Sequence, residues 1–223
     1  MSIEDNLRGL RARIAKAAEH AGRDPAGVRL IGATAAYKGV TPDMVRSALD
    51  AGLRDFGENR VQEAEAQMAG LGERAREVTW HFIGHLQTNK AAAAVKIFDW
   101  IQTVDSVRLA EQLSRRSVGP KRILLEVNVA QEASKFGFTP AEVSGAVASI
   151  AGLPNLDLAG LMTVAPIVDN PEQARPVFRR LRELAQANGL TELSMGMTND
   201  FEVAVEEGAT MVRLGRAIFG EWQ

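Results

Sequence analysis

The chain has 223 residues, of which 46% are apolar and 24% are charged, and its formal net charge is −2. This composition is typical of a globular protein with a large core, and the charge gives no electrostatic case for nucleic acid or an anionic membrane. The sequence has no cysteine, which excludes disulfides, thiol nucleophiles and thiolate metal sites.

The N-terminal segment predicts a helix and not a signal peptide. Residues 1–6 are polar and acidic, and no apolar run approaches membrane-spanning length, so we expect a cytoplasmic protein. Residues 2–21 have the apolar spacing of an amphipathic helix. Ser2 and Asp5 have the spacing of a capping box at its start, and Gly22 is suited to end it.

Short apolar runs of strand type then alternate with helical segments, which is typical of parallel βα units. The helices have recognisable starts, such as the N-cap Thr41 followed by Pro42. The predicted strands are residues 29–34, 55–57, 80–84, 100–104, 123–129, 156–163, 193–195 and 210–214.

Eight such units favour a closed (β/α)8 barrel over an open doubly wound sheet. An open sheet normally has fewer strands, and no G-x-G-x-x-G motif follows the first strand. No linker or low-complexity tract divides the chain. We therefore predict a single α/β barrel domain over residues 1–223, with the N-terminal helix outside the barrel or covering its bottom.

Two turns after the last two predicted strands are candidates for an anion site. The first contains Gly196, Thr198 and a helix start near Asn199, and the second contains Gly215. Backbone N–H groups in such turns bind anions, and in (β/α)8 barrels the loops after strands 7 and 8 frequently hold phosphate. The alternative is that both are only strand-to-helix turns of an α/β domain.

Arg213 is the side chain with the clearest predicted direction. It alternates with Val212 and Leu214, so it points into the barrel if those two face the helices. A buried arginine needs an anion or a fixed acceptor. A bound ligand is one such partner, and a structural carboxylate such as Glu126 or Asp200 is the other.

The remaining polar residues give weaker indications. The three histidines lack the spacing of a zinc site. His20 is expected on the surface, His81 in the core and His85 at a strand end, where it is a candidate to line the site. A polar cluster around the fifth strand either contributes to a site or only holds the barrel together: Glu126, Asn128, Ser134 and Lys135.

Six segments carry a more specific pattern. They are FGEN at 56–59, WHFIGHLQTNK at 80–90, SKFG at 134–137, GLMT at 160–163, LSMGMTND at 193–200 and VRLGRAIFG at 212–220. Together and in this order they resemble the pyridoxal-phosphate homeostasis proteins, over about residues 29–220. That resemblance implies a barrel of the alanine racemase N-terminal (fold type III) kind. It also implies binding of pyridoxal 5′-phosphate (PLP) as a Schiff base and a role in balancing vitamin B6 and amino-acid pools, with no firmly assigned reaction.

The resemblance also assigns cofactor-binding residues. Asn59 is expected beside the ring, and Arg213 near the pyridine nitrogen or the phosphate. An arginine at the ring nitrogen would keep it unprotonated and weaken the cofactor as an electron sink, which suits a carrier better than a transaminase. The phosphate would be held by Ser194, Met195, Gly196, Thr198, Gly215 and Arg216.

One departure from the family pattern concerns the aldimine lysine. The family's first strand ends in Ser or Thr followed by that lysine, whereas here Thr34 is followed by Ala35. We interpret Ala35 as a lysine-to-alanine substitution, engineered rather than natural. PLP would then be absent or held non-covalently, as the aldehyde or as an external aldimine with an amino acid. It would be covalent if residue 35 were lysine. The nearest lysine is Lys38. A second departure is Arg216, where the family more often has a small hydroxyl residue.

Two alternatives to a non-catalytic PLP carrier remain open. Racemases of the same barrel type add a C-terminal β-domain and use a partner's tyrosine, but this chain ends soon after strand 8 and its only tyrosine is Tyr37. A PLP-independent phosphosugar barrel would bind simple phosphates without preferring PLP. We expect a monomer that binds PLP and neither nucleic acid nor membrane.

Overall fold

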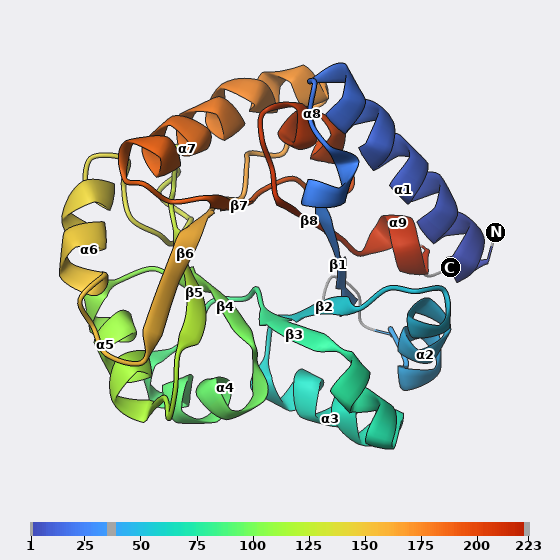
Figure 1. The fold of residues 1–223 in the computed structure, drawn as a ribbon, viewed down its shortest axis with the longest axis horizontal. Helices are drawn as coiled ribbons and strands as arrows, with labels where there is room; N and C mark the ends of the chain where they lie inside the picture. The colour runs from blue at the N-terminus through green and yellow to red at the C-terminus, as the bar shows by residue number, and fades with distance from the viewer. Residues whose placement is uncertain (1, 35–38, 221–223) are drawn as a thin grey trace.

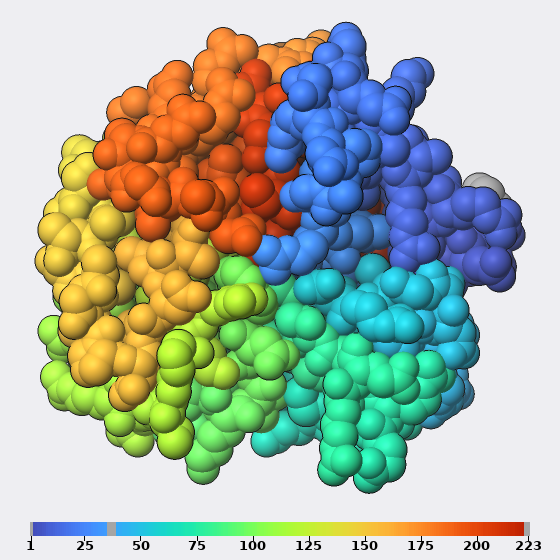
Figure 2. Space-filling view, viewed as in Figure 1, coloured from blue at the N-terminus to red at the C-terminus, as the bar shows by residue number. Residues whose placement is uncertain are grey.

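The computed structural model describes residues 2–34 and 39–220. Its strands form a closed parallel barrel in the order β1 to β8, with each strand next to its neighbours in sequence and β8 next to β1. Figure 1 shows the helices arranged around this barrel, and in Figure 2 the colours follow one another round the molecule in chain order. The predicted eight-stranded barrel is confirmed.

The strand positions agree with the apolar runs of the sequence. The strands are β1 Arg29–Ala33, β2 Asp55–Glu58, β3 Thr79–Phe82, β4 Trp100–Val104, β5 Lys121–Glu126, β6 Leu156–Met162, β7 Glu192–Ser194 and β8 Met211–Leu214. The fifth strand was predicted to reach residue 129 but ends at Glu126. The loop that follows explains the difference, because the Asn128 side chain bonds to the backbone of Glu132 and Lys135 there.

The helices begin at the predicted capping residues in several places. Ser2 and Asp5 form the expected capping box, and Thr41 caps the second helix as predicted. Ser106 caps the fifth helix in the same way. The α-helices are α1 Ile3–His20, α2 Pro42–Asp50, α3 Val61–Leu71, α4 Ala91–Ile97, α5 Val107–Arg116, α6 Val143–Ile150, α7 Arg175–Ala187, α8 Phe201–Glu206 and α9 Arg216–Phe219. Short 3-10 helices are η1 Pro25–Gly27, η3 Gly72–Glu77, η4 Thr88–Lys90 and η5 Pro171–Ala174. No helix among the described residues has both the length and the apolar character needed to cross a membrane.

Helix α1 lies outside the barrel, beside α8 and α9 (Figure 1). Its buried stripe includes Leu7, Leu10 and Ile14. The Asn6 amide donates to the backbone carbonyl of Ile218 at 2.9 Å, so the first helix is attached to the last one. Of the two positions predicted for this helix, the structure therefore shows the one outside the barrel.

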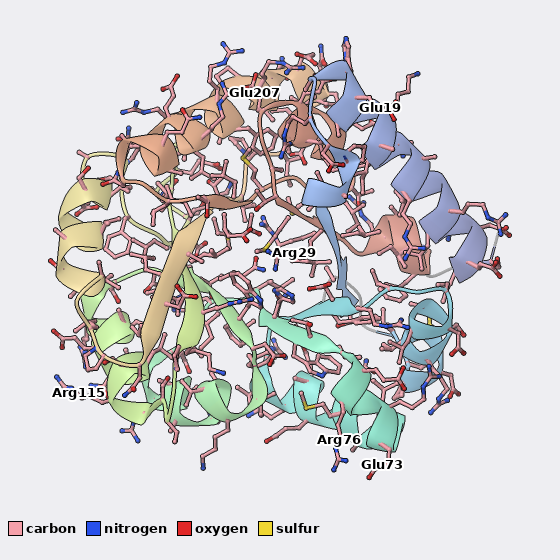
Figure 3. All side chains as sticks on the ribbon, in the orientation of Figure 1. Glu19, Arg29, Glu73, Arg76, Arg115 and Glu207 are labelled. Carbon is pink, nitrogen blue, oxygen red and sulfur yellow. The ribbon has the colours of Figure 1, made fainter. Side chains whose placement is uncertain are left out.

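Alternate strand residues divide the core into two parts. Outward-facing side chains such as Phe56 and Trp80 pack against the helices in one large cluster. The inward-facing apolar side chains form a smaller cluster inside the barrel, comprising Ile31, Trp100, Leu124, Met162 and Met211. Figure 3 shows that side chains occupy the centre of the barrel, around Arg29. Polar groups inside the barrel therefore have little water to bond with and must bond with one another.

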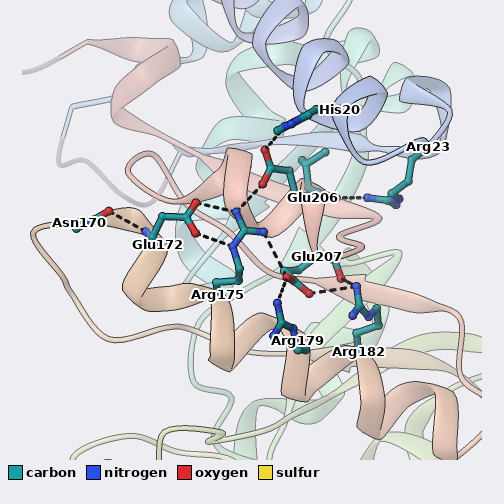
Figure 4. A network of polar contacts seen from close by, with 10 residues as sticks. His20, Arg23, Asn170, Glu172, Arg175, Arg179, Arg182, Glu206 and Glu207 are labelled. Atoms are coloured by element: carbon teal, nitrogen blue, oxygen red, sulfur yellow. Dashed lines mark hydrogen bonds and ion pairs between the residues drawn. The ribbon is translucent and has the colours of Figure 1, made fainter.

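An ion-pair network fixes α7 to α8 and α1 (Figure 4). Glu207, directly after α8, pairs with Arg179 at 3.0 Å and with Arg182 at 3.1 Å. Arg175 contacts Glu206 at 2.6 Å, and Glu206 also contacts His20 of α1 at 3.1 Å. Burial acts to raise the pKa of Glu207, but the hydrogen bonds from the arginines outweigh burial and the pKa is lowered.

We expect Gly160→Ala to destabilise the barrel by about 1–3 kcal/mol, because an added methyl group would overpack the β6–β7 contact. A Cβ at Gly160 would lie 1.9 Å from the backbone oxygen of Glu192, and backbone cannot move aside as a side chain can. Gly145→Ala is the matched control, because a Cβ there meets no atom within 4 Å. Urea unfolding should show a loss of stability for the first variant and a gain of up to about 1 kcal/mol for the second. Equal stability of the two variants would contradict this packing.

Candidate functional site

A cavity of about 370 Å³ lies where the strands end at one mouth of the barrel. Residues at or just after the ends of β1, β2, β3, β6, β7 and β8 line it. One wall is apolar and comes mainly from the segment after β6, at Val164, Pro166, Ile167 and Val168. The remaining lining is mostly polar and contains Asn59, Thr198, Asn199, Asp200, Arg213 and Arg216, which form the polar wall. The cavity thus offers both an apolar surface and a hydrogen-bonding one that carries two arginines.

The turns after β7 and β8 supply backbone donors to the polar wall. In the first turn, the N–H of Met197 donates to the Asp200 carboxylate at 2.6 Å. Within the described residues, four N–H groups of the two turns donate no backbone hydrogen bond, those of Thr198, Asn199, Gly215 and Arg216. Gly215 is buried and Thr198 is half-buried, so their N–H groups require an acceptor, whereas Asn199 and Arg216 are exposed. The two turns together present N–H groups at helix starts, which suits them to an anion.

Arg213 points into the barrel, as predicted, and its side chain is fixed by two direct hydrogen bonds. Its Nη1 donates to the Ser194 hydroxyl at 2.5 Å and its Nη2 donates to the Thr163 carbonyl at 2.8 Å. Burial lowers the pKa of Arg213 to about 10, although the charges of Glu126 and Asp200 favour the protonated form. The guanidinium is therefore still charged at neutral pH.

The two carboxylates proposed as structural partners of Arg213 act on it only through space. In the described part of the chain, no carboxylate lies within ion-pair distance of Arg213. A hydroxyl and a carbonyl are its direct partners, and both are neutral. One charge in the wall of the cavity is therefore not balanced by a direct contact, which leaves it available to a bound anion.

The structure brings together five of the residues proposed from the sequence. Asn59, Thr198, Arg213, Gly215 and Arg216 all line the cavity. The exposed Arg216 side chain begins α9 at the rim. These residues come from three strand ends that are far apart in sequence, and the closed barrel accounts for their meeting.

Three other proposed residues do not line the cavity. Ser194 lies below it, fully buried, and contacts Arg213. Met195 packs in the outer core between the barrel and the helices. Gly196 accepts a hydrogen bond from the Arg213 backbone, and its left-handed φ of 93° and close contact with Ala204 explain the need for glycine. Ala35, Tyr37 and Lys38 lie outside the described residues.

The histidines occupy three different environments. His20 is exposed and paired with Glu206, and His81 is fully buried with hydrogen bonds on both ring nitrogens. His85 lines a hollow next to the main cavity, where it contacts Asp105 at 3.2 Å and stacks on Phe136. The structure therefore places His85 near the site but not in its wall.

The polar cluster after β5 holds the loop that follows this strand. Lys135 contacts Glu132 at 2.6 Å and donates to the backbone carbonyl of Val164 at 3.1 Å, which links this loop to the apolar wall. Ser134 is exposed. Of the two interpretations of this cluster, these contacts fit the structural one.

Sequence reasoning missed Gln102, which is fully buried in the barrel and contacts both His81 and Ser194. A signal was available, since Gln102 is a polar residue two positions after Trp100 and therefore on the same, inward face of the strand. Reasoning from the sequence also missed the apolar wall, because the segment 164–168 has no periodic pattern that indicates which side chains face a cavity.

Glu58 is a buried carboxyl group next to the end of β1. The Thr34 hydroxyl donates to one of its oxygens, and the other oxygen has no hydrogen-bond partner among the described residues. Burial raises the pKa of Glu58 to about 7. The pKa of Glu126, inside the barrel, is also raised to about 7, by burial and by Asp105.

Comparison with known proteins agrees with this geometry. The chain matches the family described as alanine racemase, N-terminal domain, over residues 6–222. It is 43% identical to the pyridoxal phosphate homeostasis protein of Pseudomonas aeruginosa, covering 98% of this chain and 95% of that protein. The chain belongs to the pyridoxal phosphate homeostasis protein family. The family member of Aquifex aeolicus is 40% identical over 99% of both chains.

Solved structures give the same family. PipY of Synechococcus elongatus without PLP has a TM-score of 0.85 and 37% identity, covering 98% of this chain and all of that chain. The PLP-bound form of PipY has a TM-score of 0.82. Alanine racemase of Clostridium difficile, at 13% identity and a TM-score of 0.71, shares the fold, and the match covers 57% of that chain.

We expect Glu58→Gln to flatten the dependence of stability on pH between about 5 and 8. The pKa of Glu58 rises from 4.5 to about 7 on folding, so its stabilising effect is complete below pH 4.5 and is lost as pH rises through 7. Urea unfolding at several pH values should show wild-type stability falling relative to the variant as pH rises. Glu65→Gln, on the exposed side of α3, is the control and should follow the wild type. Parallel curves for Glu58→Gln and wild type would contradict the raised pKa.

Proposed function

We propose that this chain binds PLP non-covalently in the cavity and serves PLP and amino-acid homeostasis without turning over a substrate. The observation that carries the proposal is the polar wall, where the turns after β7 and β8 present N–H groups that have no backbone acceptor among the described residues, beside Arg213 and Arg216. The relatives named for PLP homeostasis and the PLP-bound PipY structure support it. We also propose that residues 1–223 act as one domain.

The phosphate would be held by the turns after β7 and β8. Thr198 and Asn199 supply N–H groups from one turn, and Gly215 and Arg216 supply them from the other. The Arg216 guanidinium adds a charge at the rim, while the phosphate of PLP is an anion with several acceptor oxygens. This donor set fits a phosphate group, with Ser194, Met195 and Gly196 supporting the turn from behind.

The ring would lie against the apolar wall, with Arg213 at its nitrogen and Asn59 beside it. When bound, PLP supplies an electron-withdrawing ring and an aldehyde that reacts with amines. Arg213 has only donors, so it would keep the ring nitrogen unprotonated and weaken electron withdrawal. Such a site stores the cofactor and does not favour proton abstraction from an amino acid.

Ala35 is central to the mode of binding that we propose. We infer that it occupies the place of the family's aldimine lysine and that it results from a lysine-to-alanine substitution. An alanine has no amine, so PLP would be held with its aldehyde free or already condensed with the amine of an amino acid. The cavity volume of about 370 Å³ is consistent with a ligand of that size.

We expect added PLP to give the absorbance band of a covalent adduct with Ala35→Lys and not with the chain as it stands. Borohydride reduction followed by peptide mass mapping should locate the adduct of the variant at position 35. Equilibrium dialysis should show binding to both proteins, and neither should racemise amino acids.

Three results would contradict this proposal. Failure of both proteins to bind PLP would exclude a PLP carrier and favour a phosphosugar barrel. An adduct at Lys38 of the unaltered chain would show that the anchor lies there. Clear amino-acid turnover by Ala35→Lys would establish the racemase alternative.

We expect Arg216→Ala to weaken binding of both PLP and inorganic phosphate by about tenfold, through loss of a charge-assisted contact. Arg76→Ala is the matched control, because Arg76 is an exposed arginine of η3 far from the cavity lining. Isothermal titration calorimetry of the three proteins measures both affinities. Unchanged phosphate affinity in Arg216→Ala would remove Arg216 from the proposed phosphate site.

A further inference from the structure

A continuous chain of hydrogen bonds crosses the interior of the barrel from Asp55 to Arg213. His81 Nε2 lies 2.8 Å from the Asp55 carboxylate, and His81 Nδ1 lies 2.9 Å from Gln102 Nε2. Gln102 Oε1 lies 2.6 Å from the Ser194 hydroxyl, and that hydroxyl lies 2.5 Å from Arg213 Nη1. The chain joins five strands, and Arg213 at its end lines the candidate cofactor cavity.

The chemistry of the end groups fixes the direction of every bond in this chain. An ionised carboxylate only accepts hydrogen bonds, so His81 must carry a hydrogen on Nε2. Burial is the main cause of a lowered pKa for His81, so the ring is neutral and its Nδ1 accepts. Gln102 must therefore turn its NH₂ group towards His81, which places its carbonyl oxygen against Ser194.

The same reasoning continues to Arg213. Ser194 donates its only hydrogen to Gln102, so the Ser194 lone pairs are left to accept from the guanidinium. If Gln102 were turned over, its carbonyl oxygen would face the His81 Nδ1 lone pair, and the Ser194 hydroxyl would lose the acceptor for its hydrogen. The carboxylate at one end of the barrel thus decides the orientation of an amide, and the amide fixes the direction of the Ser194 hydroxyl that accepts from Arg213.

We propose that Gln102 is a positioning residue for Arg213, which it holds through Ser194 so that the remaining guanidinium donors face the ring-nitrogen end of the bound cofactor. This inference rests on the proposed function for the identity of the ligand, but the chain itself exists without a ligand. Gln102 lies one residue away from the cavity wall and would never touch PLP. Its effect would therefore appear in ring recognition and not in phosphate binding.

The test compares Gln102→Leu with Gln67→Leu. Both glutamines are buried, but Gln67 lies in α3, outside the barrel, and donates to the Val40 carbonyl at 2.8 Å. Both substitutions remove a buried amide, but Gln102→Leu leaves two side-chain partners unpaired and Gln67→Leu leaves one carbonyl, so we expect the larger loss of stability in Gln102→Leu. Thermal melting measures this general damage, and binding is compared at a temperature at which every variant is folded. Ser194→Ala is a second variant that breaks the same chain with a smaller change.

The first readout uses the ligand-free protein and is independent of PLP. In wild type and Gln67→Leu, ¹⁵N NMR should show His81 protonated on Nε2 alone and resolved Nη signals from a fixed Arg213. Gln102→Leu and Ser194→Ala should lose the resolved Arg213 signals. If Arg213 stays fixed in both variants, the positioning role is wrong, whatever the protein binds.

The second readout measures the affinities for PLP and for inorganic phosphate by calorimetry. We expect Gln102→Leu to weaken PLP binding about tenfold, because a misplaced charged donor loses roughly one hydrogen bond, with phosphate affinity unchanged. The double variant Gln102→Leu/Ser194→Ala should lose no more than either single variant, since all three break one chain.

Three results would overturn the proposal at this stage. They are wild-type PLP affinity in Gln102→Leu, an equal loss of phosphate and PLP affinity, and the same loss in Gln67→Leu. If wild type binds no PLP at all, the proposed function fails, and the NMR comparison alone decides the role of Gln102. With ¹⁵N-labelled PLP bound, the ring-nitrogen signal should shift in Gln102→Leu and stay unchanged in Gln67→Leu.

Discussion

The interior of this barrel is organised around one buried positive charge. Arg213 lies among apolar side chains with no carboxylate in direct contact among the described residues, so neutral acceptors must hold it. A charge in such surroundings is costly unless its donors are satisfied, and each acceptor must then be satisfied in turn. The polar residues below Arg213 meet this requirement one after another until they reach Asp55, which is partly open to solvent. The requirements of a single arginine thus bear on the identities of residues on four other strands.

The sequence predicted the elements of this fold well because each one has a local cause. Alternating or continuous apolar runs located the strands, capping residues such as Thr41 located helix starts, and the count of eight favoured closure. The alternation of side chains along β8 also predicted that Arg213 points into the barrel. Local patterns do not show what a side chain meets across the barrel, however. Gln102 and Ser194 are 92 positions apart, and their contact depends on the closed barrel.

Some of the residues predicted to bind the ligand line the cavity and others do not, because local sequence patterns do not show which way a side chain points beyond a strand. Ser194, the last residue of β7, points inward, and Met195, the next residue, keeps the alternation of the strand and packs outward. Thr198 lies beyond this alternation and reaches the cavity. In the sequence motif Ser194, Met195 and Thr198 were all assigned to the phosphate. In the structure Ser194 contacts Arg213, Met195 packs in the outer core and Thr198 lines the cavity. The role proposed for residue 35 rests on the chemistry of its side chain, which the fold does not determine.

The closure of the barrel also sets the order in which the site can be completed during synthesis. Strand β1 and helix α1 are made early, but β8, which pairs with β1, and α8 and α9, which pack on α1, follow much later in the chain. Until these are made, one edge of β1 is unpaired and α1 lacks the surface that α8 and α9 provide. The turns of the polar wall after β7 and β8 come from the same late segments. A nascent chain can therefore complete the cavity only after β8 and α9 have been made, and a bound ligand would mark a barrel that has closed.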